Sequence, residues 1–486
     1  MRRMTYLTDM DRKLIFATLA LTWCLTPCRG QDQVQPDITS VEVSVAVDPS
    51  DILGPLKPMN AVNNGPYPGD REQMKDFRIL DIPFSRTHDA GEGYYGVHVV
   101  DISDVFPDFC KDPDKASSYD FRETDLYIKT LIDSGSEPFY RLGQTIENQT
   151  GAKYDIYPPK DFKKWAKICE HVIRHYNEGW ADGFHYNIRY WEIWNEADLD
   201  QSSGRWKTEP RTWGAPIEEF HKMYAVAAKH LKECFPDLKI GGPSYCRIQG
   251  VKTYFPQFFE YMRDNKVPID FISWHKYGAE PSVYIMEADM IRGWMKQYGY
   301  EDAELILNEW NYRRFRSGDG STNERYNREN RRSMKGAAFA AATMSALHAA
   351  PVDMMMYYDF RPCTSYCGFY DYQTDKRMPL YYAFYAWSKL RGSACASKIE
   401  GSDDVYAIAS AENGRTVLLL TRYDGDNNAC NIANVTVSLD RKKIEKLCCH
   451  LTDDEHIYTE ITLFPTEDGK VVVEMMNNSI ALLEIE

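Results

Sequence analysis

The chain alternates for most of its length between two hydrophobic patterns. Short runs rich in β-branched and aromatic residues predict buried strands, and longer runs with apolar residues every three or four positions predict amphipathic helices. The runs that predict strands are 58–65, 78–86, 137–143, 189–196, 238–244, 269–277, 303–312 and 352–360. The runs that predict helices are 120–135, 161–179, 217–235, 254–265, 282–299, 330–350 and 380–390.

Regular alternation of strands and helices indicates an α/β fold with parallel strands joined by crossover helices. Eight such units fit a (β/α)8 TIM barrel over residues 58–392, and a doubly wound open sheet is the alternative. Run 58–65 is the weakest of the strands, but it lies where a first strand belongs.

Helical spacing disappears from about residue 395 onward. Short strands separated by turn residues follow, among them "TVLLLTRY" and "SIALLEIE", and they predict a C-terminal β-sandwich domain over 393–486. The alternating run "SVEVSVAV" at 40–47 predicts a strand that has no place in a barrel. We therefore expect the N-terminal segment 31–57 to contribute this strand to the β-sandwich.

The N-terminus has the pattern of a secretory signal peptide over residues 1–30. Arg12 and Lys13 precede the apolar stretch 14–25, and Cys28-Arg29-Gly30 resembles a cleavage site. The apolar stretch is too short to span a bilayer, and no later segment is apolar enough to do so. The sequence predicts an exported protein, periplasmic or extracellular, that is soluble after removal of the signal and has no membrane span.

Charge and cysteine spacing narrow the choice of partners. The net charge of −15 and a pI near 5.3 argue against nucleic acid and anionic membranes. Export permits disulfides, and Cys363 and Cys367 could close a small loop. No paired C-x2-C spacing supports a zinc site. The 33 tyrosines and 11 tryptophans suit stacking on sugars, but they suit a large core equally well.

In a TIM barrel the active site lies at the C-terminal ends of the strands. Hydrogen-bonding, aromatic and carboxylate side chains occupy these ends. They are Asn63, Asn64, Arg86, His88, Arg141, Gln144, Asn195, Glu196, His275, Tyr277, Glu309, Tyr358 and Asp359.

Two Asn-Glu dipeptides give this set a specific chemistry. The dipeptide occurs at 177, 195, 308 and 323, but only 195–196 and 308–309 end apolar strands, the fourth and the seventh. Cleaving a glycosidic bond with retention requires two carboxyl groups about 5–5.5 Å apart, one as nucleophile and one as acid/base. Like charges at that distance raise one of the two pKa values. Glu196 and Glu309 are therefore the predicted catalytic pair, and the asparagine before the acid can hold the sugar 2-hydroxyl.

The segments "RTHDA", "YWEIWNEADL", "FISWHKY" and "LILNEWN" resemble glycoside hydrolase family 39, the β-xylosidase and α-L-iduronidase family of clan A. The resemblance implies Glu196 as acid/base and Glu309 as nucleophile, and it places His88, Asn195, His275 and Tyr277 in the substrate site. Their positions at strand ends add Arg86 and Tyr358 to the substrate-binding candidates.

One departure bears on the sugar. Iduronidases carry a lysine shortly after the histidine of strand six, where it holds the uronate carboxylate. Here the stretch reads His275-Lys276-Tyr277, which is closer to the xylosidase pattern. If His275 points inward, Lys276 points away, and a neutral sugar is favoured.

Rival motifs have weaker support. "GEGYYG" at 91–96 matches a dinucleotide fingerprint, but no helix follows it to meet a pyrophosphate. His171 and His175 lack the glutamate that a zincin needs directly after the first histidine, and no G-x-S-x-G is present. We expect no metal and no cofactor.

The sequence therefore predicts a secreted retaining glycosidase that releases terminal sugars, β-xylosidase-like, from oligo- or polysaccharides. Two alternatives stay open. One is a carbohydrate-binding barrel that has lost catalysis. The other is a glycosidase of the same clan with a different specificity, such as an arabinosidase, a galactosidase or an iduronidase-like enzyme.

Overall fold

The computed structural model describes residues 39–90, 98–146, 156–248, 253–316, 321–362, 364–429, 431–439 and 444–486. The predicted signal peptide, the glycine-rich motif at 91–96 and Cys363 lie outside the described residues. Cys367, the expected partner of Cys363, is a buried free thiol.

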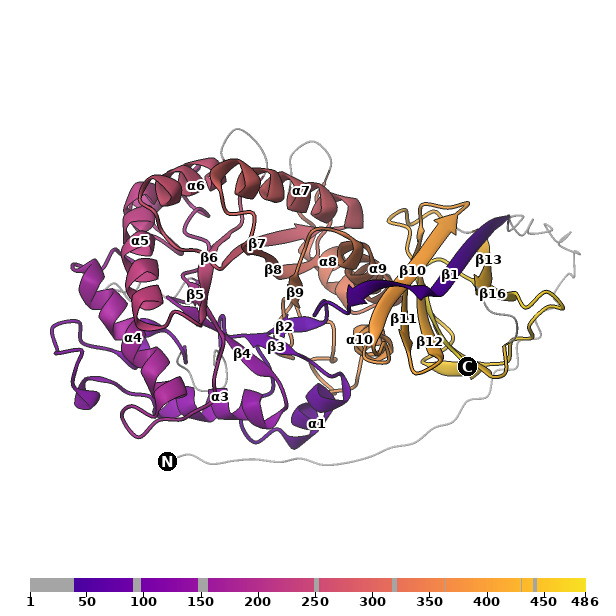
Figure 1. Cartoon of the computed structure of the whole chain (residues 1–486), viewed down its shortest axis with the longest axis horizontal. Helices are drawn as coiled ribbons and strands as arrows, with labels where there is room; N and C mark the ends of the chain where they lie inside the picture. The colour runs from indigo at the N-terminus through magenta and orange to yellow at the C-terminus, as the bar shows by residue number, and fades with distance from the viewer. Residues whose placement is uncertain are drawn as a thin grey trace, which may run out of the picture. The chain divides into compact units, whose positions relative to one another are not determined.

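Eight parallel strands close into a barrel in chain order (Figure 1). They are β2 (Ala61–Asn63), β3 (Phe84–Arg86), β4 (Glu137–Leu142), β5 (Tyr190–Ile193), β6 (Lys239–Tyr245), β7 (Phe271–Gly278), β8 (Glu304–Tyr312) and β9 (Met354–Tyr357). Pairing of β2 with β9 completes the ring. The predicted TIM barrel is confirmed, and the open-sheet alternative is wrong because such a sheet has two unpaired edges.

Helices connect the strands and surround the barrel. They are α1 (Arg71–Ile79), α2 (Ile102–Val105), α3 (Arg122–Asp133), α4 (Phe162–Glu178), α5 (Ile217–Cys234), α6 (Phe255–Asp264), α7 (Pro281–Tyr298), α8 (Glu324–Arg331), α9 (Met334–Ala349) and α10 (Pro379–Trp387), with short 3-10 turns at Ala116–Ser118 and Arg205–Lys207. Both ends of helix α4 are defined by capping residues. The Asp161 side chain accepts hydrogen bonds from two backbone amides of the first turn. Gly179, which follows the last turn, takes the left-handed conformation.

The predicted strand 78–86 is wrong over most of its length. Helix α1 runs through Ile79, and only Phe84–Arg86 forms strand. The Asp70 side chain accepts a hydrogen bond from the Gln73 amide and starts this helix, whose polar sequence hides its period. Pro83 then precedes the strand, where it cannot continue a helix.

Nine strands form one separate curled sheet, in the order β15-β14-β17-β12-β11-β10-β1-β13-β16. They are β1 (Ser40–Pro55), β10 (Ser393–Glu400), β11 (Val405–Glu412), β12 (Arg415–Arg422), β13 (Ile432–Leu439), β14 (Leu447–Thr452), β15 (Thr459–Ile461), β16 (Val471–Met475) and β17 (Ser479–Ile485). Strand β1 lies between β10 and β13, parallel to β13. Alternate residues on one face, such as Val45, Leu420 and Leu483, enclose a core of their own.

The other face of this sheet shares a core with the barrel. Ile480 and Leu482 of β17 belong to the same buried cluster as the barrel helices. Helix α9 is buried on nearly all sides, which explains why its sequence is apolar throughout. The Lys335 ammonium on α9 donates to the Gly425 carbonyl at 2.8 Å, so polar contacts also join the two parts.

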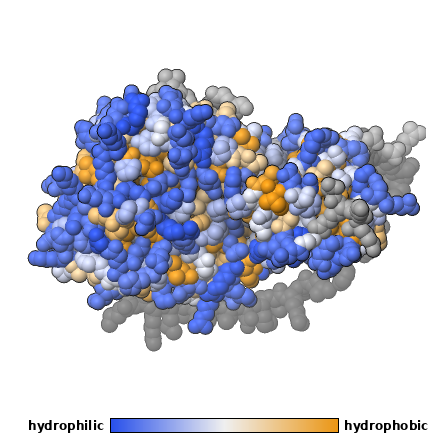
Figure 2. Space-filling view, in the orientation of Figure 1, coloured by the Kyte–Doolittle hydropathy of each residue, from blue (hydrophilic) through white to orange (hydrophobic). Residues whose placement is uncertain are grey.

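Polar residues predominate on the face of the molecule seen in Figure 2, with small apolar patches between them. Among the described helices, none is both long and apolar enough to cross a membrane.

Inside the barrel, the first inward layer is an apolar plug. It consists of Ala61, Phe84, Phe139, Tyr190, Phe271, Ile306, Met354 and Met356. Because side chains alternate between the two faces of a strand, the residue two positions further along points inward again, one layer closer to the C-terminal mouth. The polar residues of the site begin in that second layer.

Candidate active site

A layer of buried polar side chains lies directly above the apolar plug. Its members stand two residues beyond those of the plug and include Asn63, Arg86, Glu192, Ser273 and Asn308, all 0% exposed. Glu192 binds three of the others: its carboxylate accepts from Arg86 at 2.7 Å, from Ser273 at 2.7 Å and from Asn308 at 2.6 Å. The layer is a closed network that forms the floor of the site.

Irregularities at the strand ends bring the two predicted catalytic residues above this floor. In β8 the pairing with β7 slips by one residue, so Trp274 pairs with Leu307 and His275 with Glu309. The extra residue, Asn308, forms a bulge that lets both Asn308 and Glu309 reach the barrel interior.

At the end of β5, Glu196 has a positive φ of 46°. Its amide donates to the Ser244 carbonyl at 3.0 Å, and its own carbonyl accepts from the Thr212 hydroxyl at 2.7 Å. These bonds hold a backbone conformation that is unfavourable for glutamate.

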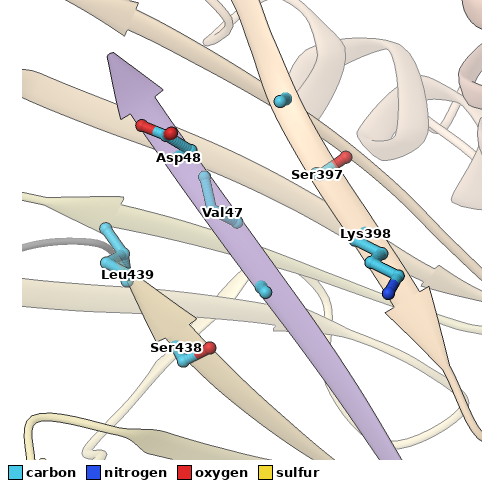
Figure 3. A pocket seen from close by; sticks show the side chains of 8 residues that line it. Val47, Asp48, Ser397, Lys398, Ser438 and Leu439 are labelled. Atoms are coloured by element: carbon cyan, nitrogen blue, oxygen red, sulfur yellow. The ribbon is translucent and has the colours of Figure 1, made fainter. Parts of the chain in front are cut away.

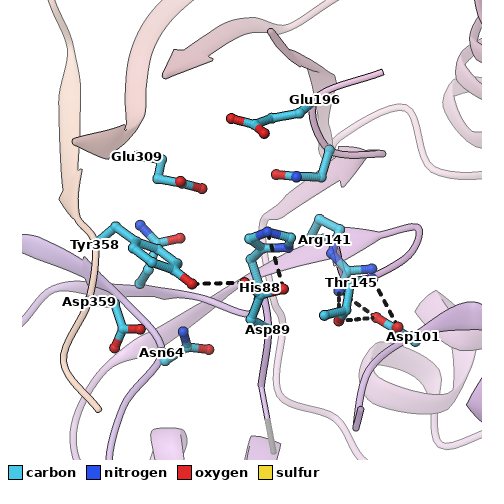
Figure 4. Close-up of polar contacts among 12 residues, drawn as sticks. Asn64, His88, Asp89, Asp101, Arg141, Thr145, Glu196, Glu309, Tyr358 and Asp359 are labelled. Carbon is cyan, nitrogen blue, oxygen red and sulfur yellow. Dashed lines mark hydrogen bonds and ion pairs between the residues drawn. The ribbon is translucent and has the colours of Figure 1, made fainter. Parts of the chain in front are cut away.

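The structure brings the two glutamates together. A carboxylate oxygen of Glu196, one of Glu309 and a ring nitrogen of His275 lie within 4.8 Å of one another. Figure 4 shows the two carboxylates turned toward each other, with His88 and Tyr358 beside the same space. This close approach of two carboxylate oxygens favours the spacing of retaining glycosidases, about 5–5.5 Å between the carboxyl groups, over the 6.5–9.5 Å that inversion requires.

Burial disfavours charge on both carboxyls. It raises the pKa of Glu196 to about 7, against the opposing charges of Arg247 and Arg86. It also raises the pKa of Glu309 to about 7, with His275 and Arg86 opposing and the charge of Glu196 adding to the rise. Two such groups hold a single proton between them near neutral pH.

Glu309 has the stronger set of donors for its ionised form. The Tyr277 hydroxyl donates to one of its oxygens at 2.5 Å, and the Arg86 guanidinium donates to the other at 3.3 Å. Burial raises the pKa of Tyr277 well above its usual value, so this hydroxyl keeps its proton. Both donors therefore stabilise the ionised form of Glu309.

The hydrogen bonds of Ser244 determine which nitrogen of His275 carries the proton. The Ser244 oxygen accepts from Arg86 at 2.9 Å and from Asn308 at 2.8 Å, which fills both lone pairs. Its own proton then goes to His275 Nε2 at 2.7 Å. Burial lowers the pKa of His275 to about 4, so the ring is neutral. His275 Nδ1 therefore carries the hydrogen and donates to Glu196 at 2.7 Å.

Arg86, a predicted substrate-binding residue, lies beneath the two carboxylates. Each of its five N–H groups already has a partner: Glu192, Asn63, Glu309, Asn195 and Ser244. The side chain is fully buried, so its contacts are with the walls of the site.

The other predicted residues lie around the pair. The Asn195 carbonyl oxygen accepts from Arg86, while its Nδ2 has no hydrogen-bond partner among the described residues. His88 Nδ1 is a second buried nitrogen of this kind. The Tyr358 hydroxyl donates to Asp89 at 2.8 Å, and Arg361 donates to the same hydroxyl at 3.3 Å. Asn195 and His88 therefore offer groups that a sugar hydroxyl could satisfy.

A pocket of about 770 Å³ opens above the pair. Of the predicted residues, six line it: His88, Glu196, His275, Tyr277, Glu309 and Tyr358. Tyr366 and Phe315 add aromatic surface. Lys276 also lines the pocket, so the prediction that it points away from the site is wrong. Its ammonium is bound to Glu287 at 2.5 Å.

A second hollow, of about 460 Å³, lies on the nine-stranded sheet among β1, β10 and β13 (Figure 3). Its charged side chains are Asp48 and Lys398. It lacks a pair of facing carboxyls, so the chemistry belongs to the barrel pocket.

Several residues of the site were missed from the sequence. Glu192, Ser244 and Asn308 build the floor, and Asp89 and Arg361 support Tyr358. Glu192 had a readable signal, because a carboxylate in the middle of the apolar run "YWEIW" must face a polar partner. Ser244 and Arg361 carried no comparable signal.

The chain is similar to known glycoside hydrolases in sequence and in fold. Glycosyl hydrolases family 39 matches residues 44–443. A β-xylosidase of Caldicellulosiruptor saccharolyticus is 28% identical over 179 residues, which are 35% of this chain and 33% of that protein. The match thus spans about a third of the length of that relative.

Solved structures share the fold over nearly the whole chain. A glucosidase from Croceicoccus marinus has a TM-score of 0.71 at 19% identity, covering 92% of this chain and 99% of that one. A monomeric β-xylosidase from Caulobacter crescentus has a TM-score of 0.67 at 16% identity, covering 91% and 99%. Because the family match covers most of its length, the chain belongs to glycosyl hydrolases family 39.

Proposed function

We propose that this protein is an exported, retaining glycosidase that works by double displacement with Glu309 as nucleophile and Glu196 as acid/base. The observation that carries the proposal is the approach of the two carboxylates within 4.8 Å, around one pocket and above one arginine. Membership of family 39 supports the same chemistry.

In the first step an oxygen of Glu309 attacks the anomeric carbon as the bond to the leaving oxygen breaks. Protonated Glu196 gives its proton to that oxygen, so the aglycone departs as a neutral alcohol. Asn195 Nδ2 is free to bind the sugar 2-hydroxyl, a contact that strengthens as the oxocarbenium character develops.

In the second step Glu196, now ionised, removes a proton from water. The water oxygen attacks the anomeric carbon, and the bond to Glu309 breaks. His275 Nδ1 remains a donor to Glu196 in both steps, so one carboxylate oxygen is held while the other faces the leaving group and then the water.

The sugar we propose is a neutral terminal residue, of the β-xyloside type. The relative from Caldicellulosiruptor saccharolyticus is named a β-xylosidase, and so is the Caulobacter crescentus neighbour. The ion pair of Lys276 with Glu287 supports a neutral sugar, because this ammonium, one of several cations that line the pocket, is already bound.

The test is a panel of nitrophenyl glycosides and the matching oligosaccharides, with NMR of the anomer first released. We expect turnover of a β-xyloside with retained configuration. An inverted product would overturn the double displacement, and preferred turnover of an arabinoside, galactoside or iduronide would replace the proposed sugar. Ligand-induced thermal shifts without turnover of any sugar would instead favour a binding protein.

Variants test the roles of the two glutamates. Glu309→Ala should abolish cleavage of all substrates. Glu196→Ala should spare the first step on activated aryl glycosides, whose leaving group needs no proton. Glu218→Ala, an exposed acid on α5, is the matched control and should keep full activity. If both active-site variants kept full activity on the oligosaccharide, the assignment would be wrong.

Export rests on the N-terminal pattern of Arg12, Lys13 and the apolar stretch 14–25. Expression of the full chain in a bacterial host, with N-terminal sequencing of the product outside the cytoplasm, tests it. We expect cleavage near Gly30. An uncleaved protein that stays in the cytoplasm would contradict export and leave the catalytic proposal intact.

A further inference from the structure

Three possible metal ligands converge on the nine-stranded sheet, far along the chain from the catalytic residues. Cys448 and His450 are two residues apart on β14, so they point to the same face. Glu460 of β15 is the register partner of His450. One ligand atom from each side chain lies within 4.8 Å of the others, and Cys448 Sγ is 3.8 Å from His450 Nδ1.

The spacing fits a tetrahedral ion with little movement. With Zn–S near 2.3 Å and Zn–N near 2.0–2.1 Å, tetrahedral ligands lie roughly 3.6 Å apart. The observed 3.8 Å between sulfur and nitrogen is within a few tenths of that value. Glu460 is exposed, so its carboxylate can turn to complete the set.

The histidine ring is already oriented. Tyr458 stacks on His450 with ring centroids 4.3 Å apart and an interplanar angle of 14°. Tyr385 of α10 packs edge-on against Tyr458 at 4.8 Å, which supports the stack from the barrel side. A ligand held in one orientation loses less entropy on binding a metal.

A second cluster with the same ligand types shows what competes with an ion. Glu170, His230 and Cys234 also converge within 4.8 Å. There, however, Arg174 binds the Glu170 carboxylate at 2.8 Å and Lys167 approaches it at 3.5 Å. Among the described residues no ion pair to Glu460 is found, although the charges of Lys446 and Arg415 act on Cys448 and that of Lys389 on His450. The catalytic cluster is likewise disfavoured, because Arg86 stands 3.3 Å from Glu309.

We propose that Cys448, His450 and Glu460 bind one divalent transition-metal ion of the zinc type, with solvent as the fourth ligand. A thiolate, a carboxylate and a neutral imidazole balance the two positive charges, and this mixed donor set suits zinc. Strand β15 forms the edge of the sheet, so the ion would join the edge strand to β14 and stabilise this corner.

Binding must release the thiol proton into solvent. Affinity should therefore rise with pH.

The test uses the full chain, reduced and stripped with chelator, and titrated with Co²⁺ as the probe. We expect one ion per chain with a thiolate-to-cobalt charge-transfer band that Zn²⁺ displaces. Cys448→Ser should abolish the band, and His450→Gln and Glu460→Gln should weaken binding by at least about tenfold. Cys110→Ser and Cys234→Ser are the matched controls, and both should keep the band.

Absence of the band, its survival in Cys448→Ser, or its loss only in Cys234→Ser would each overturn the proposal. Glu460→Gln changes an exposed side chain, so the site remains testable if a strand variant fails to fold. Circular dichroism of each apo variant checks folding. Glycosidase activity is measured in parallel, and its loss on adding metal without any charge-transfer band would place the ion at the catalytic pair instead.

Discussion

The coupling between Glu196 and Glu309 sets the width of the pH–activity profile. The two carboxylates approach within 4.8 Å, and two unit charges at about that distance repel by about 3.5 kcal/mol at an effective dielectric constant of about 20. That energy corresponds to about 2.5 pH units. The first proton leaves without this penalty, and the second leaves against it. We therefore expect a bell-shaped profile for the oligosaccharide, with limbs about 2.5 units apart on either side of neutrality.

The proposed roles of the two glutamates determine which of them titrates on each side of the pH optimum. Activity falls on the acid side as Glu309 gains a proton, and on the alkaline side as Glu196 loses one. In Glu196→Gln, tested on a dinitrophenyl glycoside, the leaving group departs without a proton, so the alkaline limb should vanish. The acid limb should stay close to its wild-type position, because Glu196 is still neutral when Glu309 first ionises.

The assay is kcat/KM against pH for the wild type on both substrates and for Glu196→Gln on the activated one. Glu218→Gln is the control for removing an exposed carboxylate and should keep both limbs. An alkaline limb that survives in Glu196→Gln would refute the assignment of the acid. Wild-type limbs less than about one unit apart would refute the close coupling itself.

Three further changes test the contacts around the pair. Tyr277→Phe removes the 2.5 Å donor to Glu309; losing about 1.5–3 kcal/mol of anion stabilisation should move the acid limb of kcat/KM up by about one to two pH units. Ser244→Ala leaves His275 Nε2 without its donor, which should cost about 1–3 kcal/mol in urea unfolding and lower activity more on oligosaccharides than on activated glycosides. Arg86→Lys keeps the charge but loses the planar fork, and the free energy of unfolding in urea should fall by at least about 2 kcal/mol; an unchanged value would contradict the five-bond network.

The barrel could be predicted because its strands are buried on both faces and most of its helices on one. A strand buried on both faces has an apolar run such as "AELILNEWNY", and a helix buried on one face has a helical period such as that of 161–179. Helix α1 was missed because its surface is mostly polar and its start depends on one capping side chain, Asp70. Hydrophobic periodicity arises when one face of an element is buried, so a helix that buries few apolar side chains shows little periodicity in its sequence.

The catalytic pair could be proposed because each glutamate ends an apolar strand. Its floor could not, because the five partners of Arg86 come from four separate segments of the chain. Glu192, Asn63, Glu309, Asn195 and Ser244 are brought to one guanidinium only by closure of the barrel. The spacing of these residues along the chain does not indicate that they meet at one side chain.

The position of Glu309 shows why a strand pattern alone would misplace the nucleophile. Ile306 points into the barrel, so strict alternation places Asn308 inside and Glu309 outside, among the helices. The one-residue slip against β7 reverses this and pairs Glu309 with His275. The Glu309 carboxylate thus faces the barrel interior because the regular pairing is interrupted. Asn308 also points inward at this bulge, where it binds Glu192 in the floor of the site. Because one bulge serves both the floor and the nucleophile, restoring regular β8 pairing would remove the site while leaving the barrel closed.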